Sequence, residues 1–68
     1  MNEDEIKVLK KEVSTKKRIA MEFASQVHDL VEDRLLSDYA QLTGLAQQTV
    51  AACEAWAVEK TKLDAVGG

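Results

Sequence analysis

The feature that most constrains this 68-residue chain is its lack of helix breakers. It contains no proline, and its three glycines are at positions 44, 67 and 68. Proline and glycine are the residues that most strongly disfavour a helix interior. Nothing therefore interrupts a helix over about residues 3–33, and only Gly44 falls inside a second helical stretch over about residues 38–65. The sequence predicts one all-α domain over residues 1–68, with a bend at about residues 34–37.

Hydrophobic residues in the first stretch recur at alternating steps of three and four. This spacing is the a/d heptad pattern of a helix that packs along one face. The stripe has one polar position, Lys16, and its hydrophobic members are Ile6, Leu9, Val13, Ala20, Phe23, Val27 and Leu30. Asn2 precedes the stretch and Glu5 follows three residues later, as in a capping box. We therefore expect the first helix to start directly after Asn2.

The second stripe is wider than an a/d seam, and this width predicts that its helix faces more than one neighbour. It comprises Tyr39, Leu42, Leu45, Ala46, Thr49, Ala52, Cys53, Trp56 and Leu63. Ser37 or Asp38 is the expected N-cap of this helix. Gly44 costs about 1 kcal/mol relative to alanine in a helix interior. It is either a point of close helix approach or a tolerated defect, and we favour the defect.

The short link between the helices favours an antiparallel hairpin. Residues whose numbers sum to about 72 then share a layer, which brings Ala20 to Ala52 and Cys53, and Lys16 to Trp56 and Glu59. A chain this short buries only ~60% of its unfolded surface, and a hairpin leaves one face of each stripe in water. We therefore predict that two hairpins form a homodimeric four-helix bundle, with higher homo-oligomers as an extension.

The expected core of the hairpin and its dimer follows from the two stripes. Its members are Leu9, Val13, Ala20, Phe23, Val27, Leu30, Leu42, Leu45, Thr49, Ala52, Cys53, Trp56 and Leu63. The single cysteine is expected to be a small buried hydrophobic residue. It cannot form an internal disulfide, and with one histidine it cannot complete a four-ligand zinc site.

The stretch VHDLVEDRLLSDY, residues 27–39, holds the only histidine and four acids. His28 and Glu32 are four residues apart on one helix face, a spacing that can supply two metal ligands. Asp29, Glu32 and Asp33 form an acidic patch that would suit a basic protein partner. The simpler interpretation is a solvated helix end. No arrangement of residues predicts catalysis, because a nucleophilic Cys53 would need His28 beside it.

Lysine and arginine gather at the other end of the hairpin. They are Lys7, Lys10, Lys11, Lys16, Lys17, Arg18, Lys60 and Lys62. This basic end is an alternative binding surface for RNA phosphates. The net charge of −3 gives no general attraction to nucleic acid, so nucleic acid is not the expected partner. No hydrophobic run approaches the ~20 residues of a membrane helix, and no signal peptide is recognised, which favours a cytoplasmic location.

The runs HDLVED, LSDYAQL and AQQTVAACEAW resemble the Rop-like family of small proteins encoded in nitrogen-fixation operons. The similarity extends over about residues 16–63. It implies an antiparallel hairpin that pairs into a rod-like four-helix dimer. It also implies a non-enzymatic accessory or adaptor role in nitrogenase assembly or cofactor handling, through a protein partner, with no catalytic residue and no cofactor. Family members often have a proline before the second helix, and Ser37 at that place implies a more flexible turn.

Overall fold

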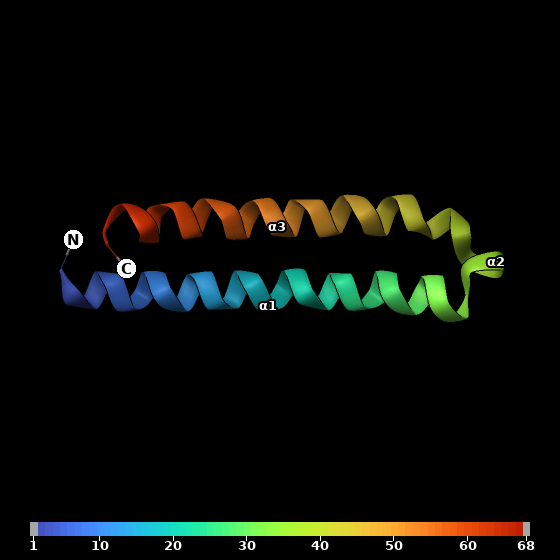
Figure 1. The fold of residues 1–68 in the computed structure, drawn as a ribbon, viewed down its shortest axis with the longest axis horizontal. Coiled ribbons are helices and arrows are strands. Elements are labelled where there is room, and N and C mark those ends of the chain that lie inside the picture. The colour runs from blue at the N-terminus through green and yellow to red at the C-terminus, as the bar shows by residue number, and fades with distance from the viewer. Residues whose placement is uncertain (1, 68) are drawn as a thin grey trace.

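The computed structural model describes residues 2–67, which form an antiparallel helical hairpin (Figure 1). The long helices α1, Glu3–Asp33, and α3, Leu42–Ala65, lie side by side. A short helix α2, Leu35–Asp38, and a 3-10 turn η1, Tyr39–Gln41, connect them. The start of α1 and the end of α3 lie at the same end of a rod 51 Å long (Figure 1). The all-α hairpin predicted from the sequence is confirmed.

Helix α1 begins where the sequence places its cap. The side-chain oxygen Oδ1 of Asn2 accepts a hydrogen bond of 2.9 Å from the backbone N–H of Glu5. This contact satisfies one of the first N–H groups of the helix, which have no partner within the helix. The acidic residues Glu3, Asp4 and Glu5 occupy the first turn, where the helix dipole favours negative charge.

The bend differs from the expected loop at residues 34–37 followed by a helix from residue 38. Only Arg34 leaves the helical conformation before α2 begins. Its carbonyl accepts hydrogen bonds from the Asp38 N–H at 2.8 Å and the Ser37 hydroxyl at 3.3 Å. Its guanidinium lies 3.6 Å from the Asp38 carboxylate. Ser37 and Asp38 therefore stabilise the bend, and neither is the N-cap of α3.

Regular α-helix resumes only at Leu42, four residues later than predicted. Its N-cap position is Gln41, whose side chain makes no capping hydrogen bond to the described residues. At the other end of α3, Gly67 has a φ of +78° and donates its N–H to the carbonyl of Asp64 at 3.2 Å. This left-handed conformation is the common way to end a helix. Gly68 lies outside the described residues.

The two long helices meet along the predicted a/d seam. The most deeply buried side chains are Leu9, Ala20, Leu30 and Leu63. Other seam positions are half-buried: Ile6, Val13, Phe23 and Val27 on α1, and Leu42, Leu45, Thr49, Ala52 and Trp56 on α3. Thr49 donates its hydroxyl to the Leu45 carbonyl at 2.7 Å, so this polar group is satisfied within its own helix. The single hairpin thus leaves most of its seam partly open to solvent.

The second stripe is narrower in the hairpin than the sequence suggested. Cys53, Ala46 and Tyr39 are exposed in the single hairpin, so Cys53 is not buried within it, whereas its predicted place in the core of a dimer stays a prediction. The reason is that α3 packs against one helix in the described chain, and one neighbour covers only an a/d seam. The sequence placed Lys16 near Glu59 as a possible ion pair. In the structure Glu59 instead pairs with Lys62, at 3.2 Å.

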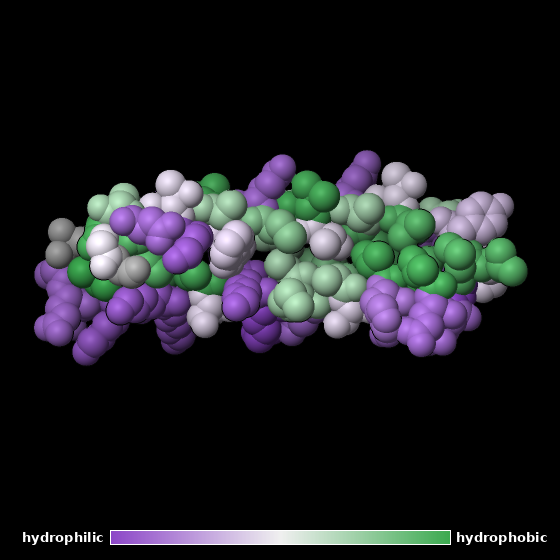
Figure 2. Space-filling model, in the orientation of Figure 1, coloured by the Kyte–Doolittle hydropathy of each residue, from purple (hydrophilic) through white to green (hydrophobic). Residues whose placement is uncertain are grey.

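Helix α3 has an unusual outer surface. From residue 42 to residue 58 its only charged side chain is Glu54. Figure 2 shows hydrophobic side chains over α3 and along the seam, whereas hydrophilic ones gather along the outer edge of α1. A helix that is apolar on several faces is usually covered on several faces. None of the helices within residues 2–67 has the length and hydrophobicity needed to cross a bilayer.

Candidate functional site

The bend end of the rod exposes large hydrophobic side chains. Leu36 is 91% exposed and Tyr39 66% exposed, and Val31 and Leu35 are also exposed. We call these four residues the bend patch. Figure 2 shows hydrophobic surface reaching this end of the molecule. Single exposed hydrophobic residues are normal on protein surfaces, but contiguous groups mark interaction sites.

Acidic side chains lie on the last two turns of α1, next to the bend patch. Asp29, Glu32 and Asp33 are all exposed, as both a docking surface and a solvated helix end require. The last turn of α1 carries no basic residue that would complement the negative end of the helix dipole. Helix stability therefore does not account for this group of acids. The bend combines hydrophobic contact area with a negative border.

Sequence reasoning named the acids but missed the bend patch. Leu35 and Leu36 fell in the predicted loop, and Tyr39 was assigned to the second stripe. The signal that could have revealed the bend patch was the pair of consecutive leucines, Leu35 and Leu36, in an otherwise polar bend. Two consecutive large side chains in a bend cannot both pack against the helices, so at least one of them must be exposed.

His28 lies on the same face of α1 as Glu32, as the sequence predicted. Its Nε2 atom is 3.0 Å from Oε2 of Glu32, and its Nδ1 atom is 3.7 Å from Oδ1 of Asp29. All three side chains are more than half exposed. Within residues 2–67, no group of three or more His, Cys, Asp or Glu side chains is arranged to hold a metal ion. His28 and Glu32 thus offer two ligands, fewer than the three or four protein ligands of zinc sites.

Several residues of the basic end are paired with acids on their own helices. Arg18 contacts Glu22, Lys60 contacts Asp64 at 3.0 Å, and Lys62 contacts Glu59 at 3.2 Å. These are exposed or half-exposed i,i+3 and i,i+4 pairs, which stabilise a helix only slightly. They reduce the positive charge that this end presents to a phosphate backbone.

Cys53 borders a hollow of about 210 Å³ on one face of the hairpin. The other lining residues are Lys17, Ala20 and Met21 of α1 and Trp56 of α3. Two pairs across this hollow, Lys17 with Trp56 and Ala20 with Cys53, have residue numbers that total 73, close to the predicted register of 72. By this register, Cys53 and the level of His28 lie about 12 Å apart along the rod, at 1.5 Å per residue. That separation keeps His28 out of hydrogen-bond reach of the thiol.

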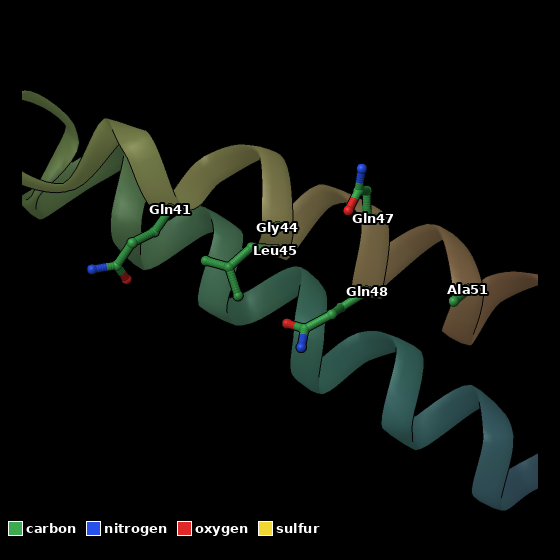
Figure 3. A pocket seen from close by; sticks show the side chains of 6 residues that line it. All are labelled: Gln41, Gly44, Leu45, Gln47, Gln48 and Ala51. Carbon is green, nitrogen blue, oxygen red and sulfur yellow. The ribbon is translucent and has the colours of Figure 1, made fainter.

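A second hollow lies along α3 around Gly44 (Figure 3). The figure shows the side chains of Leu45 and Gln48 directed toward α1, and that of Gln47 directed away from it. A Cβ added at Gly44 would meet no atom within 4 Å. In the hairpin Gly44 is therefore not a point of close helix approach.

Comparison with known proteins identifies one family. The model of the Rop-like family matches residues 4–67, almost the whole chain. No curated protein and no solved structure shows significant similarity to it.

Proposed function

Since this chain belongs to the Rop-like family, we propose that it is a homodimeric, non-enzymatic adaptor that binds a protein partner through its bend. The observation that carries this proposal is the bend patch beside Asp29, Glu32 and Asp33. Aromatic and aliphatic side chains at the centre of a surface, with charges at its border, are the usual composition of protein–protein interfaces. The negative border favours a partner with a basic binding surface.

The homodimer is supported by the shallow core of the hairpin. Among residues 2–67, Leu9, Ala20, Leu30 and Leu63 alone are buried, and the other seam residues are half-exposed. Two hairpins that pack their open seams together would form a four-helix bundle, which is the standard way to cover such stripes. Small single-core proteins commonly gain stability by association.

The partner that we propose is a protein of nitrogenase biosynthesis, acting in nitrogenase assembly or cofactor handling. This assignment is supported by the family resemblance alone. Disruption of the gene in its source organism should lower nitrogenase activity, measured as acetylene reduction under nitrogen-fixing conditions. Normal activity in the disrupted strain would contradict the nitrogen-fixation role and would leave the docking proposal to be judged by binding.

The docking proposal is tested with an affinity-tagged protein and extracts of nitrogen-fixing cells. One variant changes the bend, Leu36→Ser with Glu32→Lys. A matched control makes the same two kinds of change on exposed residues of α3, Val58→Ser with Glu54→Lys. We expect a bound protein that is retained by the wild type and the control and lost from the bend variant.

Retention of the same bound proteins by all three baits would show that the bend is not the docking surface. Circular dichroism of the two variants provides the folding check. Both should keep the helical signal of the wild type, because each substituted side chain is exposed.

A further inference from the structure

The bend interrupts the hydrogen bonding at the C-terminal end of α1. The Arg34 N–H still donates to the Leu30 carbonyl at 2.9 Å, but the chain leaves the helix at this residue. Within residues 2–67, the backbone carbonyls of Val31, Glu32 and Asp33 accept no hydrogen bond from another residue. A cationic side chain near a helix end often satisfies such carbonyls, and the last turn of α1 contains none. These acceptors are therefore left to water or to a partner.

The acidic patch lies around these carbonyls. Its three carboxylates contact no lysine or arginine within the described residues. Arg34 is the only basic side chain of the stretch 27–39, and it lies 3.6 Å from Asp38 instead. The stretch holds four acids against this one arginine, a net charge of −3. The end of α1 thus combines carbonyl and carboxylate acceptors with a shortage of positive charge.

The bend patch places hydrophobic surface on the same short segment. Leu36 and Tyr39 are its most exposed members, at 91% and 66%. An exposed tyrosine ring offers a face on which a guanidinium can stack, and exposed leucines offer contact to aliphatic side chains. A ligand for this end therefore needs both a cationic hydrogen-bond donor and hydrophobic groups beside it.

Arginine matches these acceptors better than lysine does. Its guanidinium presents five N–H donors in a planar fork, pairs with a carboxylate through two parallel hydrogen bonds, and stacks on aromatic rings. The lysine ammonium has three donors and holds its hydration water more strongly. A surface that offers carboxylates, carbonyls and an aromatic ring together favours the guanidinium.

We propose that the bend binds a protein segment in which an arginine is flanked by hydrophobic side chains. The guanidinium supplies the cap that α1 lacks, and it donates to the carbonyls of residues 31–33 and to the carboxylates of Asp29 and Asp33. The hydrophobic neighbours of the arginine contact Leu36 and Tyr39. The inference rests on the docking proposal above and adds the chemistry of the bound segment.

Peptide titration tests the inference on the full-length protein in its native oligomeric state. The probe is a synthetic peptide of alternating leucine and arginine with blocked ends, added to isotope-labelled protein and followed through the backbone amide resonances. We expect the shifts to concentrate on residues 29–39. The lysine counterpart should bind about tenfold more weakly, because it loses one of the two paired charge-assisted hydrogen bonds. The glutamate counterpart should not bind.

Two variants with the same net charge separate a local cap from general attraction. Asp33→Arg places a basic side chain in the last turn of α1, where it competes for the same carbonyls. It should raise the unfolding midpoint by a few degrees through the helix dipole and weaken binding of the arginine peptide at least about tenfold.

Glu54→Arg is the matched control on an exposed residue of α3. By the register of the hairpin it lies ~21 Å along the rod from Asp33, at 1.5 Å per residue. Because exposed charges this far apart are largely screened, its affinity for the peptide should stay within about twofold of the wild type.

The outcomes distinguish this inference from the docking proposal. Equal losses of affinity in Asp33→Arg and Glu54→Arg would mean that the peptide responds to overall charge, and would overturn the inference. Equal affinities of the arginine and lysine peptides at the bend would overturn the arginine cap and leave the bend as a docking surface. Shifts outside residues 29–39, or no binding, would also overturn the inference, and the experiment with cell extracts decides the docking proposal separately.

Discussion

Leu30 and Leu36 show how position in the hairpin decides the role of one side chain. Leu30 is fully buried, with 0% exposure, whereas Leu36 is 91% exposed six residues later. Arg34 leaves the helical conformation between them and changes the direction of the chain. The same amino acid thus belongs to the core at one position and to the bend patch at the other.

The replacement Leu30→Ala should lower the free energy of unfolding by about 2–5 kcal/mol, because it removes a fully buried side chain and leaves a cavity. Urea denaturation followed by circular dichroism measures this change. Leu36→Ala is the matched control and should change stability by less than about 0.5 kcal/mol, as exposed substitutions usually do. Equal losses for the two variants would mean that Leu36 is covered in the assembled protein.

Gly44 is a second position where a single substitution tests the packing of α3. The replacement Gly44→Ala should raise the free energy of unfolding by up to about 1 kcal/mol, because alanine favours a helix interior and the added methyl group meets no atom within 4 Å. Gly67→Ala is the control: the left-handed φ of +78° there disfavours alanine, so this change should not stabilise the protein. Loss of stability in Gly44→Ala would place a neighbouring subunit against that side of α3.

At the scale of the elements, α1 and α3 differ in how they are stabilised. Helix α1 has a side-chain cap, acids in its first turn and a polar outer face. Helix α3 starts without a side-chain cap among the described residues and carries a single charged side chain over residues 42–58. Its helical structure therefore depends more on packing, which accords with a second subunit against it.

The cap of α1 gives a prediction at this scale. Asn2→Ala should lower the free energy of unfolding by about 1 kcal/mol, because the N–H of Glu5 loses its side-chain acceptor. Asn2→Asp is the matched control and should retain most of the stability, since its carboxylate can accept the same bond. Thermal unfolding followed at 222 nm compares them. If Asn2→Ala unfolds like the wild type, the end of α1 frays without affecting the rest of the hairpin.

The whole molecule is a thin rod, with extents of 51, 14 and 12 Å. In a rod only two helices wide, most side chains of the seam remain partly exposed to solvent. The stability of the rod should therefore depend on association with another molecule. The unfolding midpoint should therefore rise with protein concentration, because dimerisation favours the folded state by mass action. Differential scanning calorimetry over a hundredfold concentration range measures this, with native mass as the independent check. A midpoint that stays constant, together with a monomeric mass, would contradict the homodimer.

Local patterns were enough to predict much of this protein. The stretch without proline or glycine, Asn2 ahead of it and the a/d spacing from Ile6 to Leu30 predicted the bounds of α1, its cap and the face that it buries. These features act over one or two helical turns, so neighbouring residues alone determine them. The antiparallel hairpin then followed from the short link.

The exposure of Cys53 and the hollow beside it depend on residues distant in the sequence, whereas the bend depends on a local choice between two sets of hydrogen bonds. Ser37 and Asp38 have the composition of caps, but the carbonyl of Arg34 engages them and delays α3 to Leu42. Cys53 fits a hydrophobic stripe, but α1 covers only the seam beside it. The exposure of Cys53 depends on which atoms of α1 lie at the same level, and a one-dimensional hydrophobic pattern does not contain that information.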